Sequence, residues 1–190
     1  MSSGGAQNSL LKLLDLSQCE CRNEAAANSL LGLLQNQEKK TESAAVLESG
    51  NEDPQLFISV GFSVPVRLTG LRLQTPKGAV AAGEAPRRLQ TDPATDEFVG
   101  HMAAERRRRS LRDRQKELPE DESLEAGLTL PLKSVRYKGV ASLQVFVADN
   151  GGAPVTKISQ LEVYGTPVDS LQMKDWKPLK PEESLAQNDT

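Results

Sequence analysis

Aromatic residues, cysteine and histidine are scarce in this chain, and each scarcity excludes a class of protein. Aromatics make up 4% of the 190 residues, so a hydrophobic core must be built mainly from Leu, Val and Ile. No run of about 18 apolar residues occurs, so we expect no membrane-spanning helix. The N-terminal stretch MSSGGAQNSLLKLLDL has neither a basic start nor a continuous apolar run, so it is not predicted to be a secretory signal. We therefore expect a cytoplasmic or nuclear location.

Two cysteines and one histidine leave little material for metal, redox or catalytic chemistry. Cys19 and Cys21 are separated by a single residue, and a disulfide that tight would strain the usual geometry. Zinc sites take about four ligands, and beyond these two thiols the chain offers only His101. No G-x-S-x-G motif, P-loop or G-x-G-x-x-G motif occurs. The sequence thus predicts two reduced thiols, no cofactor, no metal and no enzymatic activity.

The overall charge is slightly negative, with one strongly basic run. Lys and Arg number 23 against 26 Asp and Glu, and the formal net charge of −3 predicts no general attraction to nucleic acid or anionic membranes. The exception is the uninterrupted run Arg106, Arg107, Arg108 and Arg109. Such a run is typical of a nuclear import signal or a nucleic-acid patch, and also of a solvated segment whose charge neighbouring acids offset. No aromatic residues interleave with it for base stacking, which argues against nucleic acid.

Segment 64–75 alternates apolar and polar residues, as a half-buried β-strand does. The alternation passes through Val66 and Leu68 and then slips by one position at Gly70, where it resumes with Leu71. One extra residue beside a glycine is how a β-bulge appears in a sequence, because the bulge restores the register of the strand. We therefore predict a bulge at Gly70.

Other segments also have the alternation or the β-branched and aromatic content of strands, namely 55–62, 127–140, 142–149 and 154–165. The pattern in 127–140 continues as far as Val135 and Tyr137, and its Pro131 requires an edge or irregular position. Turn signals such as Asn150-Gly151-Gly152 separate the strands, and no long helices alternate with them. This organisation predicts an antiparallel sandwich or barrel.

Helical signals are short. NSLLKLL at 8–14 recurs as NSLLGLL at 28–34, and each copy predicts one or two helical turns that pack on the body of the domain. The stretch 76–126 is rich in Ala, Gly, Pro and charge. Only 86–91 is predicted to form a strand there; the rest is expected to be loop, with an exposed helix over 103–117 as the alternative.

Three blocks of the sequence carry motifs that occur together elsewhere. They are LLDLSQCECRNEAAANSL (13–30), LESGNEDPQLFISVGFSVPVRLTGLRL (47–73), and a third that runs from LPLKSVRYKGVASLQVFVADN (130–150) to VTKISQLEVYGTPVDSLQMKDWK (155–177). In this order the blocks resemble the PITH domain family. Cys21 and Asn23 match a Cys-Leu-Asn step of that family, with Arg22 in place of the leucine. Residues 76–127 depart from the family pattern, which has a K-x-(V/I)-(K/R)-(I/F)-F strand where this chain has PRRLQTD.

The resemblance implies an all-β fold, a jelly-roll β-sandwich of the galactose-binding-domain-like kind with short peripheral helices. It also implies a non-catalytic protein-interaction module that associates with the 26S proteasome. Neither a C-x-x-C motif nor a βαβ pattern occurs, so the redox activity of two-domain relatives is not expected. We expect a monomer with a disordered N-terminus at 1–9, a domain at 10–178 with a long polar and basic insertion at about 92–126, and a disordered tail at 179–190.

Two alternatives remain open at this point. One is a jelly roll that binds a small ligand or glycan at its loops, and the other is nucleic-acid binding through the Arg106–Arg109 run. For a protein partner, the candidate binding residues are Arg136, Lys138, Asp175 and Trp176. Trp176 is the only tryptophan, and we expect it either to fold back as an apolar lid over one end of the sandwich or to anchor a partner.

Overall fold

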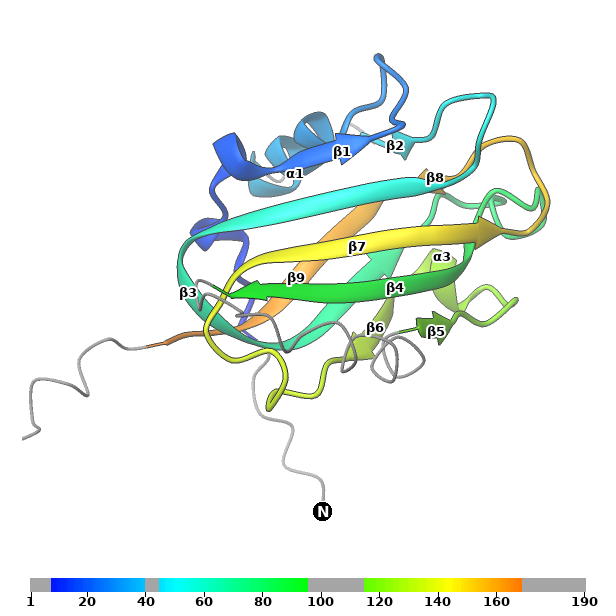
Figure 1. Ribbon diagram of the computed structural model, residues 1–190. Helices are drawn as coiled ribbons and strands as arrows, with labels where there is room; N and C mark the ends of the chain where they lie inside the picture. The colour runs from blue at the N-terminus through cyan, green and yellow to red at the C-terminus, as the bar shows by residue number, and fades with distance from the viewer. Residues whose placement is uncertain (1–7, 40–44, 96–114, 169–190) are drawn as a thin grey trace, which may run out of the picture.

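One long strand belongs to both layers of the fold (Figure 1). The computed structural model describes residues 8–39, 45–95 and 115–168. In it, β3 (Leu56–Gln74) is 19 residues long, and its first half pairs with β7 whereas its second half pairs with β9 and β6. The register of the β3–β7 pair shifts between Gly61 and Val66, where the strand bends from one layer to the other. The two strands that the sequence predicts at 55–62 and 64–75 are thus one continuous strand.

All strand pairs are antiparallel, and they form two layers. The front layer has the order β1-β3-β7-β4-β5, and in the rear layer β9 and β6 both pair with β3. The remaining strands are β1 (Glu20–Arg22), β4 (Pro86–Thr95), β5 (Gln115–Glu117), β6 (Leu128–Pro131), β7 (Val140–Asn150) and β9 (Gln160–Pro167), with β2 (Leu47–Glu48) and β8 (Lys157–Ile158) as a separate pair. The described helices are η1 (Leu11–Leu13), η2 (Leu16–Gln18), α1 (Leu30–Lys39) and α3 (Ser123–Ala126). The predicted all-β sandwich with short peripheral helices is confirmed.

The core between the layers consists mainly of aliphatic side chains, as the scarcity of aromatics predicts. Ile58 and Val145 come from the front layer, and Leu71 and Leu161 from the rear layer, each at most 1% exposed. These residues share one face because side chains in a strand alternate between faces. Burying such side chains is the main favourable term for a fold of this kind.

The predicted β-bulge at Gly70 is confirmed. Leu68 pairs with Gly165 and Gly70 pairs with Tyr164, so that Thr69 is the extra residue on β3. The shift keeps both Leu68 and the leucine at position 71 on the buried face, where each is 0% exposed. Without it, one half of the strand would turn its leucines to solvent.

The two NSLL repeats fold differently because their surroundings differ. In the first copy the backbone pairs with β9 before the helical turn begins: the Leu10 amide donates to the Val163 carbonyl at 2.9 Å, and only the 3-10 turn η1 follows. In the second copy the Leu30 amide donates to the Glu24 carboxylate at 2.7 Å, which caps the start of the longer helix α1. Leu30 is 1% exposed and Leu10 is 2% exposed, so both copies pack on the body as predicted.

The sequence underestimates the order in the middle of the chain. It predicts a strand only at 86–91, but β4 extends to Thr95, and β5 and α3 lie in the stretch expected to be loop. The prediction fails because β4 is polar, with the sequence PRRLQTDPAT, and propensity-based reasoning gives such a segment little weight. β4 is paired on both sides, by β7 and β5, so tertiary hydrogen bonding and the burial of Leu89 (0% exposed) decide its conformation.

We expect Leu71→Ala to lower the free energy of unfolding by about 2–5 kcal/mol, because the leucine is fully buried and its truncation leaves a cavity. Urea denaturation measures this loss. Leu31→Ala is the matched control: Leu31 is 39% exposed on α1, and its change is expected to stay within about 0.5 kcal/mol. Equal losses in the two variants would contradict the assignment of the core.

Candidate functional site

The connection between β6 and β7 is held rigidly at both ends. We call residues 132–139 the basic turn. The Leu132 amide donates to the Thr69 carbonyl at 2.9 Å, and the Tyr137 carbonyl accepts from the Leu68 amide at 2.8 Å. The Tyr137 side chain is 5% exposed, and its hydroxyl lies 2.6 Å from the hydroxyl of buried Thr91 on β4. These contacts fix the two ends of the turn to both layers of the sandwich.

Between its anchors the basic turn exposes cations around one apolar side chain. Val135 is 92% exposed, and Lys133, Arg136 and Lys138 are all exposed. The sequence pattern predicts that Val135 continues the strand alternation with Tyr137, and this is wrong. The strand ends at Pro131, and the Arg136 amide donates back to the Lys133 carbonyl at 2.9 Å, so the chain turns and the alternation no longer assigns faces.

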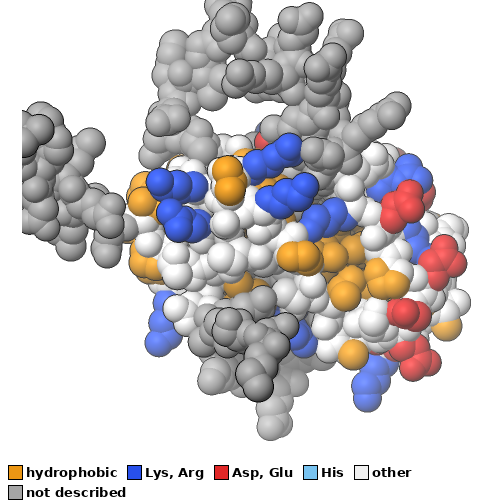
Figure 2. Space-filling model, turned by 90° about the horizontal axis from the view of Figure 1, so that it is seen from below, with side chains coloured by type: hydrophobic (Ala, Val, Ile, Leu, Met, Phe, Trp, Pro, Cys, Tyr) orange, Lys and Arg blue, Asp and Glu red, His pale blue; other side chains and the backbone are white. Residues whose placement is uncertain are grey.

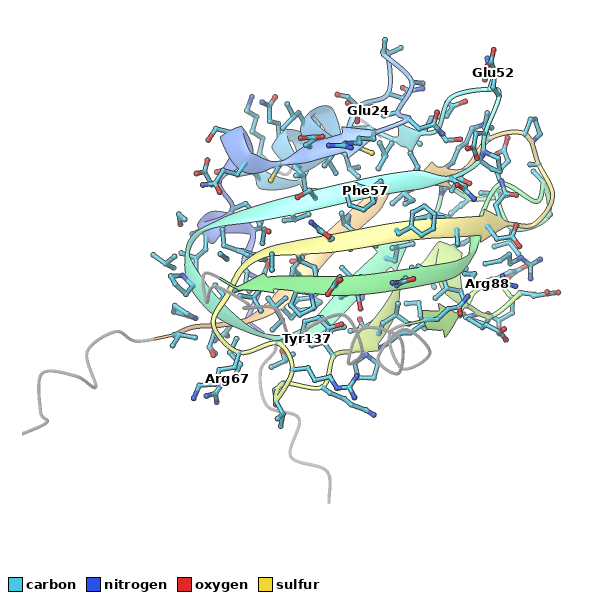
Figure 3. All side chains as sticks on the ribbon, in the orientation of Figure 1. Glu24, Glu52, Phe57, Arg67, Arg88 and Tyr137 are labelled. Atoms are coloured by element: carbon cyan, nitrogen blue, oxygen red, sulfur yellow. The ribbon has the colours of Figure 1, made fainter. Side chains whose placement is uncertain are left out.

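Two cations from other strands extend the positive surface of the turn. Arg67 is exposed and precedes Leu68, whose amide bonds the turn; Figure 3 shows Arg67 and Tyr137 at the same end of the molecule. On the other side, the ammonium of Lys116 on β5 donates to the Pro131 carbonyl. Burial lowers the pKa of Lys116, and the neighbouring charge of Lys133 lowers it further. We call Arg67, Lys116 and the three cations of the basic turn the basic rim.

Three cations of the rim form no ion pair with the residues that the structure describes. Elsewhere Arg87 pairs with Glu120 at 2.6 Å and Lys157 pairs with Glu84 at 2.9 Å. Across the three described ranges, neither Arg67 nor Lys133 nor Lys138 forms an ion pair. Figure 2 shows Lys and Arg side chains gathered on this face with hydrophobic side chains among them. The rim therefore presents a positive field to solvent.

An acidic cluster lies beside one end of the rim. We call it the acidic corner; its members are all exposed and follow or end β5, namely Glu117, Glu120, Asp121 and Glu122. Asp121 accepts hydrogen bonds from Ser123 at the start of α3, and these lower its pKa, so this carboxylate remains ionised. Figure 2 shows the Asp and Glu side chains at one edge of the same face. The face thus changes from positive to negative across β5.

A second feature lies on the outer side of the front layer. We call it the aromatic row: Arg22 pairs with Phe57, Phe57 with Phe146, and Phe146 with Gln90, across β1, β3, β7 and β4. Both rings are half-buried, and Figure 3 labels Phe57 on β3. The Arg22 guanidinium lies 5.9 Å from the centre of the Phe57 ring. The chain has four phenylalanines, so the row places two of them on the outer face, away from the core. Two adjacent rings flanked by an amide and a cation form a flat surface that can stack on a ligand.

The two cysteines and Asn23 lie in β1 or directly beside it. Cys19 is buried, Cys21 is half-buried, and neither forms a disulfide. Burial, and then the charges of Glu24 and Glu20, raises the pKa of Cys21 to about 12, so this thiol stays protonated and poorly nucleophilic at neutral pH. The Asn23 amide donates to the backbone carbonyls of residues 53 and 55, at 2.8 and 2.6 Å, and ties the loop before β3 to the end of β1.

Two kinds of feature are absent from the part of the chain that the structure describes. Within 8–39, 45–95 and 115–168 there is no group of three or more His, Cys, Asp and Glu side chains placed to hold a metal ion. No helix of the same ranges has the length and apolar content needed to cross a membrane.

The predicted site residues divide into two groups. Arg136 and Lys138 both lie on the basic turn, where the structure brings them together with Lys133 and Arg67. The positions of Asp175, Trp176, His101 and the run Arg106–Arg109 lie outside the described residues. Lys133 is recognisable from the sequence as a cation of the same turn. Arg67 and Lys116 are not, because only the pairing of distant strands places them beside it.

The architecture is shared with jelly-roll domains of several solved structures. The C-terminal domain of a chitobiase from Bacteroides fragilis superposes with a TM-score of 0.56 at 16% identity, covering 85% of this chain and 100% of that one. The family 32 carbohydrate-binding module of C. perfringens NanJ, solved in complex with galactose, gives 0.55 at 10% identity and covers 80% and 98%. An F5/8 type C domain from Bacteroides fragilis gives 0.55 at 13% identity and covers 86% and 99%. At these identities the likeness establishes the fold, a galactose-binding-like jelly-roll β-sandwich, as predicted.

Within that fold class the sequence assigns the family. The PITH domain family matches residues 2–182, nearly the whole chain. The chain belongs to the PITH domain family, which confirms the resemblance of the three sequence blocks. The segment PRRLQTD departs from the strand motif of the family, and it nevertheless forms a strand, the first part of β4.

We expect Tyr137→Phe to lower the free energy of unfolding by about 1–2 kcal/mol, because it leaves the buried Thr91 hydroxyl without its partner. It should also speed hydrogen exchange of the Leu68 amide, which bonds the turn. Tyr164→Phe is the control, since Tyr164 bonds Glu162 at a half-exposed position. If both variants leave the Leu68 amide equally protected, Tyr137 does not anchor the turn.

Proposed function

We propose that this protein is a non-catalytic interaction module that associates with the 26S proteasome, in the cytoplasm or nucleus. Membership of the PITH domain family supports the proteasome as the partner. The single structural observation that supports docking is the basic turn. Buried contacts hold it at both ends, while the Val135 side chain between them is 92% exposed. A surface that is already ordered before binding loses little conformational entropy when a partner covers it.

The charge on the described surface is consistent with recognition by docking. Arg67, Lys133 and Lys138 form no ion pair among the described residues and can gain partners at an interface. Complementary charge mainly raises the rate and specificity of association. The aliphatic tip among them supplies an apolar contact that excludes water. No residue of this surface needs to react for the module to act.

Purified 26S proteasome tests the proposal directly. The full chain, carrying a fluorescent label, should co-migrate with the 26S particle on native gels and be displaced by excess unlabelled chain. The isolated 20S core particle serves as a control for non-specific adsorption. Absence of co-migration with the 26S particle, with a folded chain confirmed by circular dichroism, would refute the association.

A glycan-binding module is the second candidate, favoured by the aromatic row. Aromatic rings stack on the apolar faces of sugars while amides bond their hydroxyls, and Phe57, Phe146 and Gln90 provide both on one flat face. The shared fold of a carbohydrate-binding module that was solved with galactose agrees with this function. The row contains few groups that fix the orientation of a ligand, so we rank this function second.

If the row binds sugars, a saturating glycan from a panel that includes galactose should raise the melting temperature by about 2–4 °C, by mass action on the folded state. Phe57→Ala should abolish the shift, since the ring supplies the stacking surface. Val64→Ala, at an apolar position that is 39% exposed elsewhere, should keep it. A panel without any shift, or a shift that survives Phe57→Ala, excludes the row as a sugar site.

A further inference from the structure

The tip of the basic turn differs from other exposed apolar positions of the described chain. Val135 is 92% exposed, whereas Leu31 and Val64, the next large apolar side chains, are 39% exposed. A single exposed valine is ordinary by itself. Here, however, Lys133 lies two residues before it and Arg136 directly after it, so that an apolar contact and two cations occupy one turn. A ligand that covers Val135 must also meet these charges.

The arrangement of the cations favours an extended segment of a partner over a compact ligand. The cations are distributed along the rim, from Arg67 on β3 through the basic turn to Lys116 on β5. The ammonium of Lys116 is held by the Pro131 carbonyl, which places its charge next to that of Lys133. A chain of carboxylates that runs along the rim therefore pairs with several cations in succession.

The acidic corner gives the rim a direction. Asp121 and Glu122 follow the end of β5, and Figure 2 shows Asp and Glu side chains at one edge of the face, beyond the Lys and Arg side chains, so the negative charge begins past the end of the rim. Charges of like sign repel over a screening length of about 8 Å at physiological ionic strength. An acidic segment that continued past Lys116 would meet the carboxylates of the corner, whereas a basic end would be attracted to them.

We infer that, given the docking function proposed above, the basic rim binds an acidic, extended segment of a partner protein that carries an aliphatic side chain over Val135. The segment ends, or becomes basic, where it reaches the acidic corner. Its carboxylates pair with Arg67, Lys133 and Lys138, which have no ion-pair partner among the described residues. A nucleic-acid strand fits this surface less well, because its phosphates are uniformly negative and the rim presents neither an aromatic ring for stacking nor an uninterrupted positive track.

A pair of charge-reversed proteins tests the role of the rim. The probe is a fluorescein-labelled synthetic peptide of Asp and Glu residues around a central Leu, titrated with the full chain and followed by anisotropy. Lys133→Glu/Lys138→Glu should weaken binding by at least about tenfold, because two attractions become repulsions. Lys12→Glu/Lys39→Glu carries the same net charge on exposed positions of η1 and α1 and should stay within about twofold. Equal losses in both double variants would show only a net-charge effect and would overturn the inference.

The aliphatic contact and the role of the acidic corner have separate tests. Val135→Ser should weaken binding of the Leu peptide but not of a matched peptide with Ser in place of Leu, and equal losses for both peptides would exclude an apolar contact at the tip. Of two peptides of one composition, the one with a lysine pair at one end should bind at least about threefold more tightly than the one with the pair in the middle, because only a terminal pair can reach the acidic corner while the carboxylates lie along the rim. Equal affinities would overturn the role of the acidic corner. A single-stranded DNA oligonucleotide that binds more tightly than the acidic peptide would overturn the choice of partner.

Capture by purified 26S proteasome separates this inference from the proposed function. Wild-type capture with loss in Lys133→Glu/Lys138→Glu supports both. Equal capture of the wild type and of that variant leaves the function standing and refutes the rim as the docking surface. Selective binding of the acidic peptide without any capture by the proteasome supports the rim and refutes the proteasome as partner.

Discussion

The bend in β3 is the constraint on which the rest of the structure depends. A single strand of 19 residues pairs with β7 in front and with β9 and β6 behind, so the two layers are connected by one continuous backbone. The strand can serve both layers only if its apolar face stays on the inside after the bend. Val66 and Leu68 are buried directly after the bend, and the extra residue at Thr69 keeps the apolar face inside as far as Leu71, because it shifts the phase of the alternation by one position. The core between the layers is then a continuous set of aliphatic side chains.

The hydrogen bonds of β3 around the bulge also hold the candidate docking surface in place. Leu68, one residue before the bulge, bonds the Tyr137 carbonyl, and the Thr69 carbonyl accepts from Leu132, so the bulge itself holds both ends of the basic turn. The hydroxyl pair of Tyr137 and Thr91 ties the turn to the front layer. Stability and recognition therefore depend on the same segment: the side chains that point inward anchor the turn, and those between them are exposed to solvent.

How much of the fold and the site can be predicted depends on how far apart in the sequence the interacting residues lie. The bulge at Gly70 is predictable because alternation is local, and a slip in phase is visible in adjacent residues. β4 is only partly predictable, because pairing on both sides holds a polar segment in place. Arg136 and Lys138 are found from the sequence as neighbours in one motif, whereas Arg67 joins them through a contact between β3 and the turn. Val135 is misassigned, since an alternating pattern does not show where a strand ends.

The sequence by itself determines the class of the fold, the family, the aliphatic nature of the core and the scarcity of groups for catalysis. These properties depend on composition and on periodicity over a few residues, which a linear chain displays directly. Only the tertiary structure decides that three distant segments contribute one basic rim, that an acidic corner borders it, and that two phenylalanines share the outer face of the front layer. These arrangements arise from strand pairing across many residues and from hydrogen bonds that close the end of the sandwich, and neither leaves a local mark in the sequence.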